Sequence, residues 1–183
     1  QGAQLFRSLG LKPGDSLAFM MENHKLFFPI AFAAYRSGLK YTAISWRLQA
    51  SEVEYIVKDC GAKVFITSKF LEESAKDLSS SLEGVNKFML DGESGDFLSY
   101  EDAIRNMPNT PIEDECQGAS MLYSSGTTGK PKGVSREIKI SPLPYTPDEE
   151  DVGLTRVVQG LYSASEDSVY LSPAPLYHTA PMG

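Results

Sequence analysis

The sequence is poor in the residues that build metal sites and disulfides. Its 183 residues include two cysteines, two histidines and one tryptophan. Cys60 and Cys116 lie far apart, and neither belongs to a C-x-x-C pair, so we expect neither a metal site nor a disulfide. Two free thiols are typical of a reducing compartment, and we therefore expect a cytoplasmic protein.

Long apolar runs and an excess of positive charge are also missing. The longest apolar-rich run, Leu26 to Tyr35, is much shorter than the roughly 20 residues of a membrane-spanning helix, and no signal peptide is visible at Gln1. We therefore expect no integral membrane segment. The chain has 17 Lys and Arg against 24 Asp and Glu, a net charge of −7, which argues against a nucleic-acid partner. The sequence does not indicate the oligomeric state.

One segment, residues 123–134, concentrates hydroxyl side chains, glycines and lysines in the sequence Tyr-Ser-Ser-Gly-Thr-Thr-Gly-Lys-Pro-Lys-Gly-Val. Glycines let backbone N–H groups come close to anionic oxygens. Serine and threonine hydroxyls donate further hydrogen bonds, and lysines add point charges. Lys130, Lys132 and Arg136 form a local basic cluster in this acidic chain. The composition predicts a site for a polyphosphate.

The spacing of this segment differs from that of a Walker phosphate loop. Two residues, rather than four, separate Gly126 from Gly129, and Pro131 follows Lys130 where the Walker pattern needs Ser or Thr. A polar surface hairpin between two strands is the alternative interpretation. Ordinary hairpins need only one or two special residues, so the composition favours a binding loop.

Short apolar runs alternate with helical periodicity, which predicts an α/β protein with a mostly parallel sheet and helices on both faces. Ligands of such sheets bind at the carboxyl ends of the strands. The strand ending at Tyr123 would deliver the hydroxyl-rich loop to that edge. We predict strands over 16–21, 64–67, 87–90, 119–123 and 134–138, and helices over 1–9, 24–37, 51–60 and 71–82 with a further one starting at Ser99.

Several residues predict where helices begin and end. Gly38 is well placed to stop the helix over 24–37, and Pro29 should kink that helix or mark a late start. Ser51, with Glu54 three residues later, predicts a capping box.

The loop resembles the phosphate-binding signature of the adenylate-forming (AMP-binding) superfamily, which holds acyl-CoA synthetases, luciferases and the adenylation domains of peptide synthetases. The match covers residues 124–129 and 131–133. Pro175-Leu176-Tyr177-His178 resembles the superfamily's Pro-Leu-aromatic-His motif beside the acyl pocket. A more diffuse similarity, from Gly14 to Lys63, follows the N-terminal region of acyl-CoA synthetases.

The resemblance implies that residues 1–183 are part of the large N-terminal domain of an adenylate-forming enzyme. We expect a phosphate loop at 123–134, a surface insertion at about 140–151 and an acyl-pocket motif at 175–178. The rest of that domain and a small C-terminal domain would lie outside the chain, which begins at Gln1 and ends directly after a motif.

The resemblance also implies an activity. A carboxylic acid would attack the α-phosphorus of ATP to give an acyl-adenylate and pyrophosphate, and coenzyme A would then displace AMP to give a thioester. Mg²⁺ would offset the phosphate charge. The small residue Ala180 would leave a roomy acyl pocket, which favours a fatty or bulky aryl acid. The superfamily's magnesium carboxylate and reacting lysine would lie further along, so we expect this chain alone to be inactive.

By resemblance, Lys132 and Thr128 would be catalytic and His178 would line the approach of the acid or the thiol, whereas His24 would be structural. No metal ligand is expected in the chain. Tyr123 is either a core residue or a binding residue. The other interpretations of the whole protein are a peptide-synthetase adenylation domain, a luciferase-like enzyme and a non-catalytic nucleotide-binding module. The expected ATP contacts are Ser124, Ser125, Gly126, Thr127, Thr128, Gly129, Lys130 and Lys132.

Overall fold

The structure of the protein is a computed structural model. It describes residues 1–124, 131–135, 160–161, 163, 165, 167–169, 171 and 174–178. The predicted surface insertion at 140–151 lies outside these residues.

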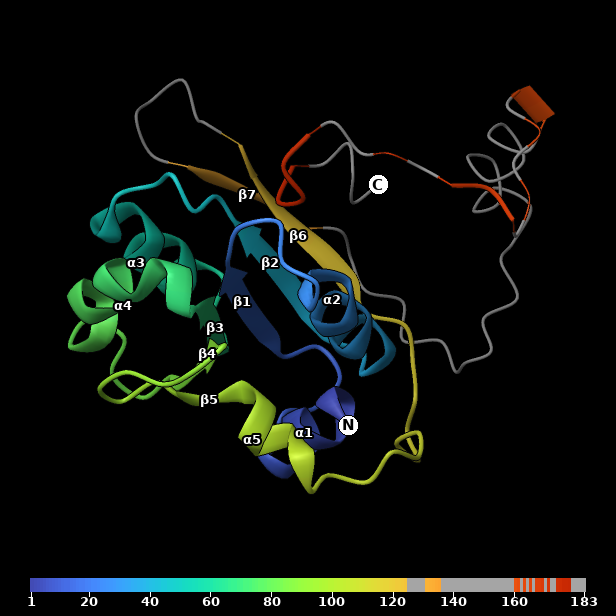
Figure 1. Cartoon of the computed structure of the whole chain (residues 1–183), viewed down its shortest axis with the longest axis horizontal. Helices are drawn as coiled ribbons and strands as arrows, with labels where there is room; N and C mark the ends of the chain where they lie inside the picture. The colour runs from blue at the N-terminus through green and yellow to red at the C-terminus, as the bar shows by residue number, and fades with distance from the viewer. Residues whose placement is uncertain are drawn as a thin grey trace.

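Seven strands of the described residues form one sheet in the order β5-β4-β3-β1-β2-β6-β7 (Figure 1). Neighbouring strands are parallel from β5 to β6, and β7 is antiparallel to β6. The chain therefore places β2 on one side of β1 and returns to place β3 on the other. The strands are β1 (Ser16–Met20), β2 (Lys40–Ile44), β3 (Ala62–Ser68), β4 (Asn86–Leu90), β5 (Leu98–Ser99), β6 (Ala119–Ser124) and β7 (Lys132–Ser135).

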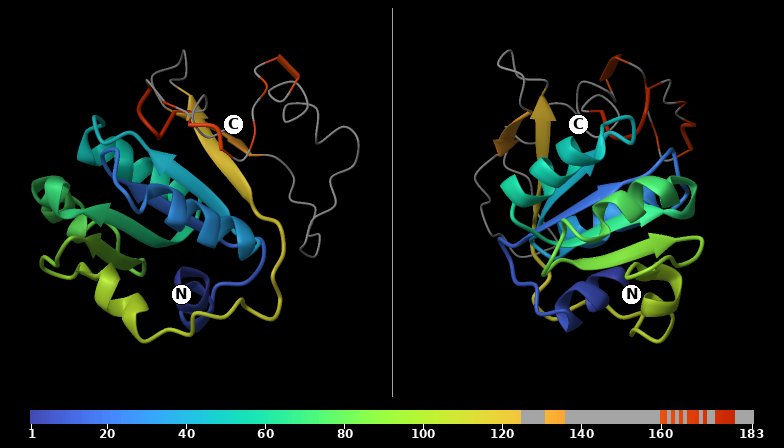
Figure 2. Two further views of the ribbon diagram at one scale, coloured as in Figure 1. Left: turned by 45° about the vertical axis from the view of Figure 1, so that its right-hand side comes forward. Right: turned by 90° about the vertical axis from the view of Figure 1, so that its left-hand side faces the viewer.

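Helices cover both faces of the sheet, which confirms the predicted fold class (Figure 2). On one face, α1 (Gly2–Ser8), α2 (Phe27–Arg36) and α5 (Tyr100–Arg105) pack over a cluster that we call the first core. On the other face, α3 (Ala50–Asp59) and α4 (Glu72–Ser79), the latter preceded by the short η1 (Lys69–Leu71), pack over the second core.

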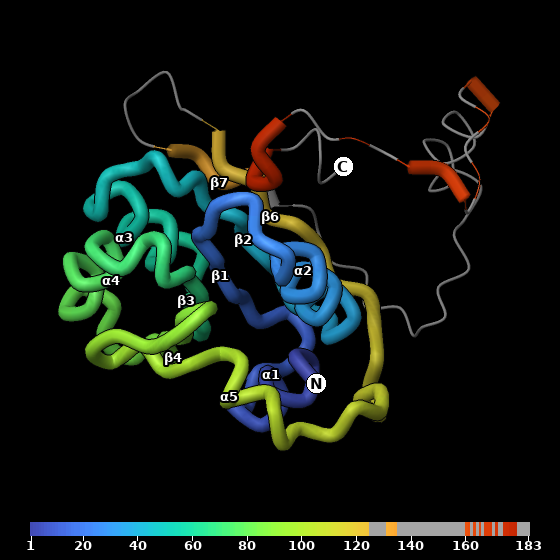
Figure 3. Tube along the Cα trace, viewed as in Figure 1, coloured from blue at the N-terminus to red at the C-terminus, as the bar shows by residue number. Residues whose placement is uncertain are grey.

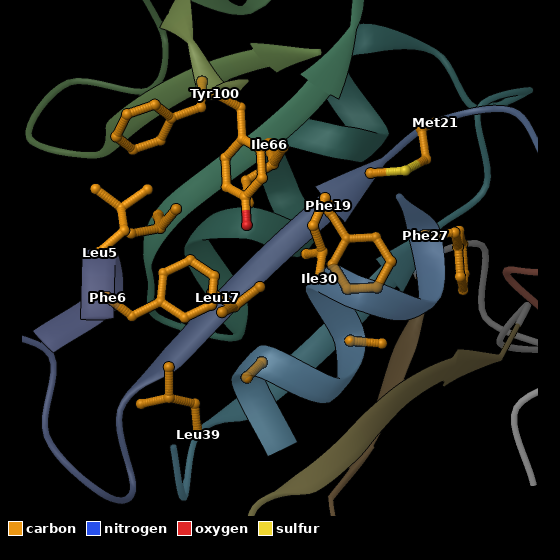
Figure 4. Packing of buried hydrophobic residues seen from close by; sticks show 14 of the residues in the cluster. Leu5, Phe6, Leu17, Phe19, Met21, Phe27, Ile30, Leu39, Ile66 and Tyr100 are labelled. Carbon is orange, nitrogen blue, oxygen red and sulfur yellow. The ribbon is translucent and has the colours of Figure 1, made fainter. Parts of the chain in front are cut away.

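Strand β1 supplies both cores because successive side chains of a strand point to opposite faces. Leu17 and Phe19 belong to the first core, whereas Ala18 and Met20 belong to the second. All of β1 is buried. Figure 4 shows Phe19 beside Phe27 of α2 in the first core, where the two rings pack edge to face with centroids 5.1 Å apart.

Two predicted helix starts are wrong. Helix α2 begins at Phe27 rather than at His24. The His24 ring lies before the helix, where its Nδ1 accepts the N–H of Leu26 at 3.1 Å. Pro29 falls in the first helical turn, so it marks a late start. Helix α3 begins at Ala50, since Gln49 is extended and its N–H donates to Glu52 Oε2 at 2.9 Å.

The predicted capping box of Ser51 and Glu54 is therefore wrong by two residues. Ser51 already lies in the first turn of α3, and Glu54 instead forms an ion pair with Lys58 one turn later. The predicted start at Ser99 is confirmed, because its side chain accepts the N–H of Asp102 at 3.2 Å.

Three features of the sheet differ from the prediction. Strands β2 and β5 were not predicted, since the first half of β2 is only half-buried and β5 has two residues. Strand β7 begins at Lys132 rather than at Val134.

Residues 106–118 cross the molecule from α5 to the start of β6, as Figure 3 traces, and bring β6 against β2.

Candidate phosphate-binding site

The candidate site lies at the edge of the sheet where parallel strands end. Strands β1, β2, β3, β4 and β6 all run in one direction, so the segments that follow them meet at the same edge (Figure 1). The chain leaves β1 toward β2 on one side and later adds β3 on the other. In open α/β sheets such a reversal of strand order, at the carboxyl ends, is the usual place for a ligand.

Strands β6 and β7 bring two predicted ATP contacts together at this edge. Ser124, the last residue of β6, is paired with Lys132, the first residue of β7, and both are exposed. The other predicted contacts, which are Ser125, Gly126, Thr127, Thr128, Gly129 and Lys130, lie outside the described residues.

This pairing places a hydroxyl donor and an ammonium group opposite each other at the end of a hairpin. Lys132 forms no ion pair within the part of the chain that the structure describes, whereas Lys63 and Lys87 pair with Asp15 and Asp96. An exposed cation next to a hydroxyl suits an anionic ligand, since each can donate to a phosphate oxygen.

The predicted acyl-pocket motif also packs at this edge. The N–H of Leu176 donates to Asn23 Oδ1 at 3.0 Å, and Asn23 lies just after β1 in the chain. Leu176 and Tyr177 pack against the first core. A turn, in which the N–H of His178 donates to the Pro175 carbonyl at 3.0 Å, leaves His178 exposed beside the Tyr177 ring. The motif is thus held at the end of β1, with its histidine facing solvent.

Other polar groups at this edge satisfy one another. The buried Ser68, at the end of β3, donates its hydroxyl to Glu22 Oε2 at 2.5 Å. His24 Nδ1 accepts a backbone N–H, so the ring hydrogen lies on Nε2, which donates to Asp91 Oδ2 at 2.9 Å. Only 8% of the His24 side chain is exposed. These bonds fit the structural role predicted for His24.

The described residues do not provide a metal site. They contain no group of three or more His, Cys, Asp or Glu side chains that could hold a metal ion. Cys60 and Cys116 are buried free cysteines. Burial raises the pKa of both thiols, which lowers their reactivity. No helix within the described ranges is long and apolar enough to span a bilayer.

Sequence reasoning missed two residues that hold segments of the site, Asn23 and Asp59. Tyr123 donates its hydroxyl to Asp59 Oδ2 at 2.5 Å and packs half-buried against the second core. Burial, followed by this hydrogen bond, raises the pKa of Tyr123. Tyr123 and Asp59 are 64 residues apart, and Asn23 and Leu176 are 153 apart, so no local pattern relates either pair.

Residues 1–183 match the protein family described as AMP-binding enzyme. The chain belongs to the AMP-binding enzyme family. Among its relatives, a feruloyl-CoA synthase from an Amycolatopsis species is 25% identical over 97% of this chain and 32% of its own length. The long-chain-fatty-acid–CoA ligase of Thermus thermophilus is 29% identical over 94% of this chain and 31% of its own length. The chain thus spans about a third of the length of these curated AMP-binding relatives.

Solved structures agree with this assignment at the level of the fold. The apo structure of MbtA from Mycobacterium smegmatis matches 99% of this chain and 33% of its own, with a TM-score of 0.77 and 23% sequence identity. The sheet and its covering helices are therefore the AMP-binding fold, and the hairpin of β6 and β7 belongs to it.

Proposed function

We propose that the complete protein is an AMP-forming acid–thiol ligase. It would activate a carboxylic acid with ATP to an acyl-adenylate and then transfer the acyl group to coenzyme A. Membership of the AMP-binding family supports this chemistry, and two of the relatives are named as CoA ligases or synthases. The observation that carries the proposal is the pair Ser124 and Lys132, exposed and opposite each other at the carboxyl edge of the sheet.

The first step joins two anions, so it needs positive charge and hydrogen-bond donors around the phosphates. Lys132 would place its ammonium on a phosphate oxygen, and Ser124 would donate its hydroxyl. Thr128 and the rest of residues 125–130 would donate further hydrogen bonds to the phosphates from hydroxyl and backbone N–H groups. Mg²⁺, when bound, would neutralise further phosphate charge, and no residue of this chain is assigned to it.

His178 would line the approach of the acid or of the thiol. The motif's turn at the end of β1 supports this role, because it leaves the His178 ring exposed at the same edge as the hairpin. The imidazole can accept or donate a hydrogen bond near neutral pH.

We propose a fatty acid as the substrate and keep a bulky aryl acid as the second candidate. The T. thermophilus relative is named for long-chain fatty acids, and the Amycolatopsis relative is named for feruloyl-CoA. Turnover of acetate, a long-chain fatty acid and ferulate by the complete protein distinguishes them. Preference for acetate would contradict both.

The reaction itself is tested with the complete protein, ATP, coenzyme A and a long-chain fatty acid. We expect ATP–pyrophosphate exchange that depends on the acid, and an acyl-CoA product that depends on coenzyme A. Exchange without a thioester would indicate an adenylation domain or a luciferase-like enzyme instead. Binding of ATP without exchange would indicate a non-catalytic module. The 183-residue chain alone should give no exchange, and detectable exchange would refute that expectation.

A further inference from the structure

The hairpin of β6 and β7 has little support from the rest of the sheet. Pairing between β2 and β6 covers only Lys40 with Ala119 and Tyr41 with Ser120. From Met121 onward, the strand partner of β6 is β7 (Figure 1). An isolated two-stranded hairpin is only marginally stable in water. Side-chain contacts must therefore hold its outer half in place.

Tyr123 makes the contact that joins this outer half to a helix. Its hydroxyl donates to Asp59 Oδ2 at 2.5 Å, and Asp59 is the last residue of α3. Met121, two residues earlier on the same face of β6, packs with Tyr123 against the second core. Among the described residues, this hydrogen bond and the packing of Met121 and Tyr123 connect the outer half of the hairpin to the body of the molecule.

Gly133 makes room for this arrangement. It is paired with Tyr123 across the hairpin. A Cβ atom at position 133 would lie 2.9 Å from Tyr123 Cζ and 2.6 Å from Met121 Cε. Both distances are too short for carbon atoms, so any side chain there would displace the ring. An aromatic side chain that covers a cross-strand glycine is a known way to fix strand register.

We propose that Tyr123 and Asp59 are positioning residues for the phosphate loop, because their hydrogen bond ties the hairpin that carries Ser124 and Lys132 to the end of α3. This inference rests on the proposed function of that hairpin. Tyr123 directly precedes Ser124, and Gly133 directly follows Lys132. A hairpin released from Asp59 would have to be ordered by ATP, and that ordering would lower the apparent affinity.

The test compares matched variants of the complete protein in acid-dependent ATP–pyrophosphate exchange. Tyr123→Phe removes only the hydroxyl, and Asp59→Ala removes the acceptor. Each should raise the KM for ATP by about 3- to 10-fold, the effect of one lost hydrogen bond. The KM for the acid should stay within about 2-fold of the unsubstituted value, since the hairpin carries no proposed contact to the acid.

Two further variants are the controls. Tyr55→Phe removes a second tyrosine hydroxyl, which donates to the other oxygen of Asp59 at 3.5 Å and belongs to α3 rather than to the hairpin. Asp59→Asn keeps an acceptor oxygen for Tyr123. Both should leave the KM for ATP within about 2-fold of the unsubstituted value. Equal effects of Tyr123→Phe and Tyr55→Phe, or an equal rise in both KM values, would overturn the proposal.

The hydrogen bond between Tyr123 and Asp59, which we call the tether, can also be tested without an activity measurement, by amide hydrogen exchange of the complete protein. Tyr123→Phe should speed exchange in residues 132–135 by roughly 5-fold, and Tyr55→Phe should not, because only the first releases the hairpin. If exchange behaves so but the enzyme does no adenylation, the proposed function fails while the tether stands. If exchange in this segment is unchanged, the tether itself is wrong.

Discussion

At the scale of single residues, Gly38 decides how the chain turns from α2 into β2. Its φ is +67°, a left-handed conformation that favours glycine, and its carbonyl accepts the N–H of Gly14 at 2.8 Å. A Cβ atom there would lie 2.5 Å from Cys116 Sγ and 3.0 Å from Pro13 Cβ. Position 38 is therefore limited to glycine for two separate reasons, backbone conformation and lack of space.

We expect Gly38→Ala to destabilise the protein by about 2–4 kcal/mol, as the sum of backbone strain and overpacking. Gly61→Ala is the matched control, because Gly61 has a φ of +63° and a Cβ atom there would meet no other group within 4 Å. Its cost should be about 1–2 kcal/mol. Free energies of unfolding from urea titrations measure the cost of each substitution. Equal costs would show that Cys116 and Pro13 move aside for the new Cβ atom with little loss of stability.

Predictions for single residues were confirmed where a residue type strongly prefers one local position, such as the start or the end of a helix. Glycine at the end of an apolar helix predicted the stop at Gly38, and Ser99 predicted a helix start. It failed for Asp59 and Asn23, whose partners are distant in the chain. An acidic residue at the end of a helix is ordinary, so nothing in the sequence marks Asp59 as the partner of Tyr123.

At the scale of elements, a hydrogen bond attaches the segment 174–178 to the residues that follow β1. Leu176 donates its N–H to Asn23 Oδ1, while Leu176 and Tyr177 pack against the first core. The apolar contacts favour burial of the segment, but the hydrogen bond fixes its backbone at one point. The position of His178 should therefore depend on Asn23.

Replacement of Asn23 tests this attachment. Asn23→Leu removes the acceptor at similar volume, and Asn23→Asp retains an acceptor oxygen. The leucine variant should speed amide exchange at Leu176 by about 5-fold, as expected for the loss of about 1 kcal/mol. The aspartate variant should exchange like the unsubstituted protein. Identical exchange in all three proteins would show that the bond to Asn23 does not hold the segment.

Element boundaries were harder to predict than the elements themselves. Buried apolar runs identified β1, β3 and β4, but the first half of β2 is only half-buried, so its pattern was too weak. The sequence predicted the cap of α3 at Ser51, but Gln49 is the extended residue before the helix and its N–H donates to Glu52.

At the scale of the whole molecule, carboxylates that link distant elements make stability depend on pH. Burial alone would raise the pKa of Asp15, but hydrogen bonds from Lys63 and from the Lys12 N–H lower it. Burial alone would also raise the pKa of Asp96, but hydrogen bonds from Lys87 and Ser79 outweigh this effect and lower the pKa. These pKa values are lower in the folded than in the unfolded protein.

The sign of the pH dependence follows. The stabilising contribution is present above the unfolded pKa of about 4 and is lost as pH falls through the lower folded values. Urea midpoints measured from neutral pH down to about pH 3 should therefore decrease. Lys63→Met should flatten the decrease, whereas Lys25→Met should not, because Lys25 is exposed and 4.0 Å from its nearest carboxylate, Asp91. The same profile for Lys63→Met and the unsubstituted protein would contradict this account.

The fold class was predictable because alternating apolar strands and helices leave few architectures. The strand order was not, since the return from β2 across β1 to β3, and the pairing of β6 with β2, depend on packing between distant segments. For the site, the sequence predicted the loop and the motif at 175–178, and the structure places Ser124, Lys132 and His178 at one edge of the sheet. The contacts that hold them there came only from the structure.

The central claim is that the hairpin end holds the phosphates of ATP. The most direct test is the rate of acid-dependent ATP–pyrophosphate exchange by the complete protein with Lys132→Ala, beside Lys12→Ala, an exposed lysine that precedes β1 at the opposite edge of the sheet. We predict that Lys132→Ala lowers kcat/KM for ATP by about 10- to 100-fold, as expected for the loss of a charged hydrogen bond, and that Lys12→Ala leaves it unchanged. An unchanged kcat/KM for Lys132→Ala would contradict the assignment of this hairpin to ATP.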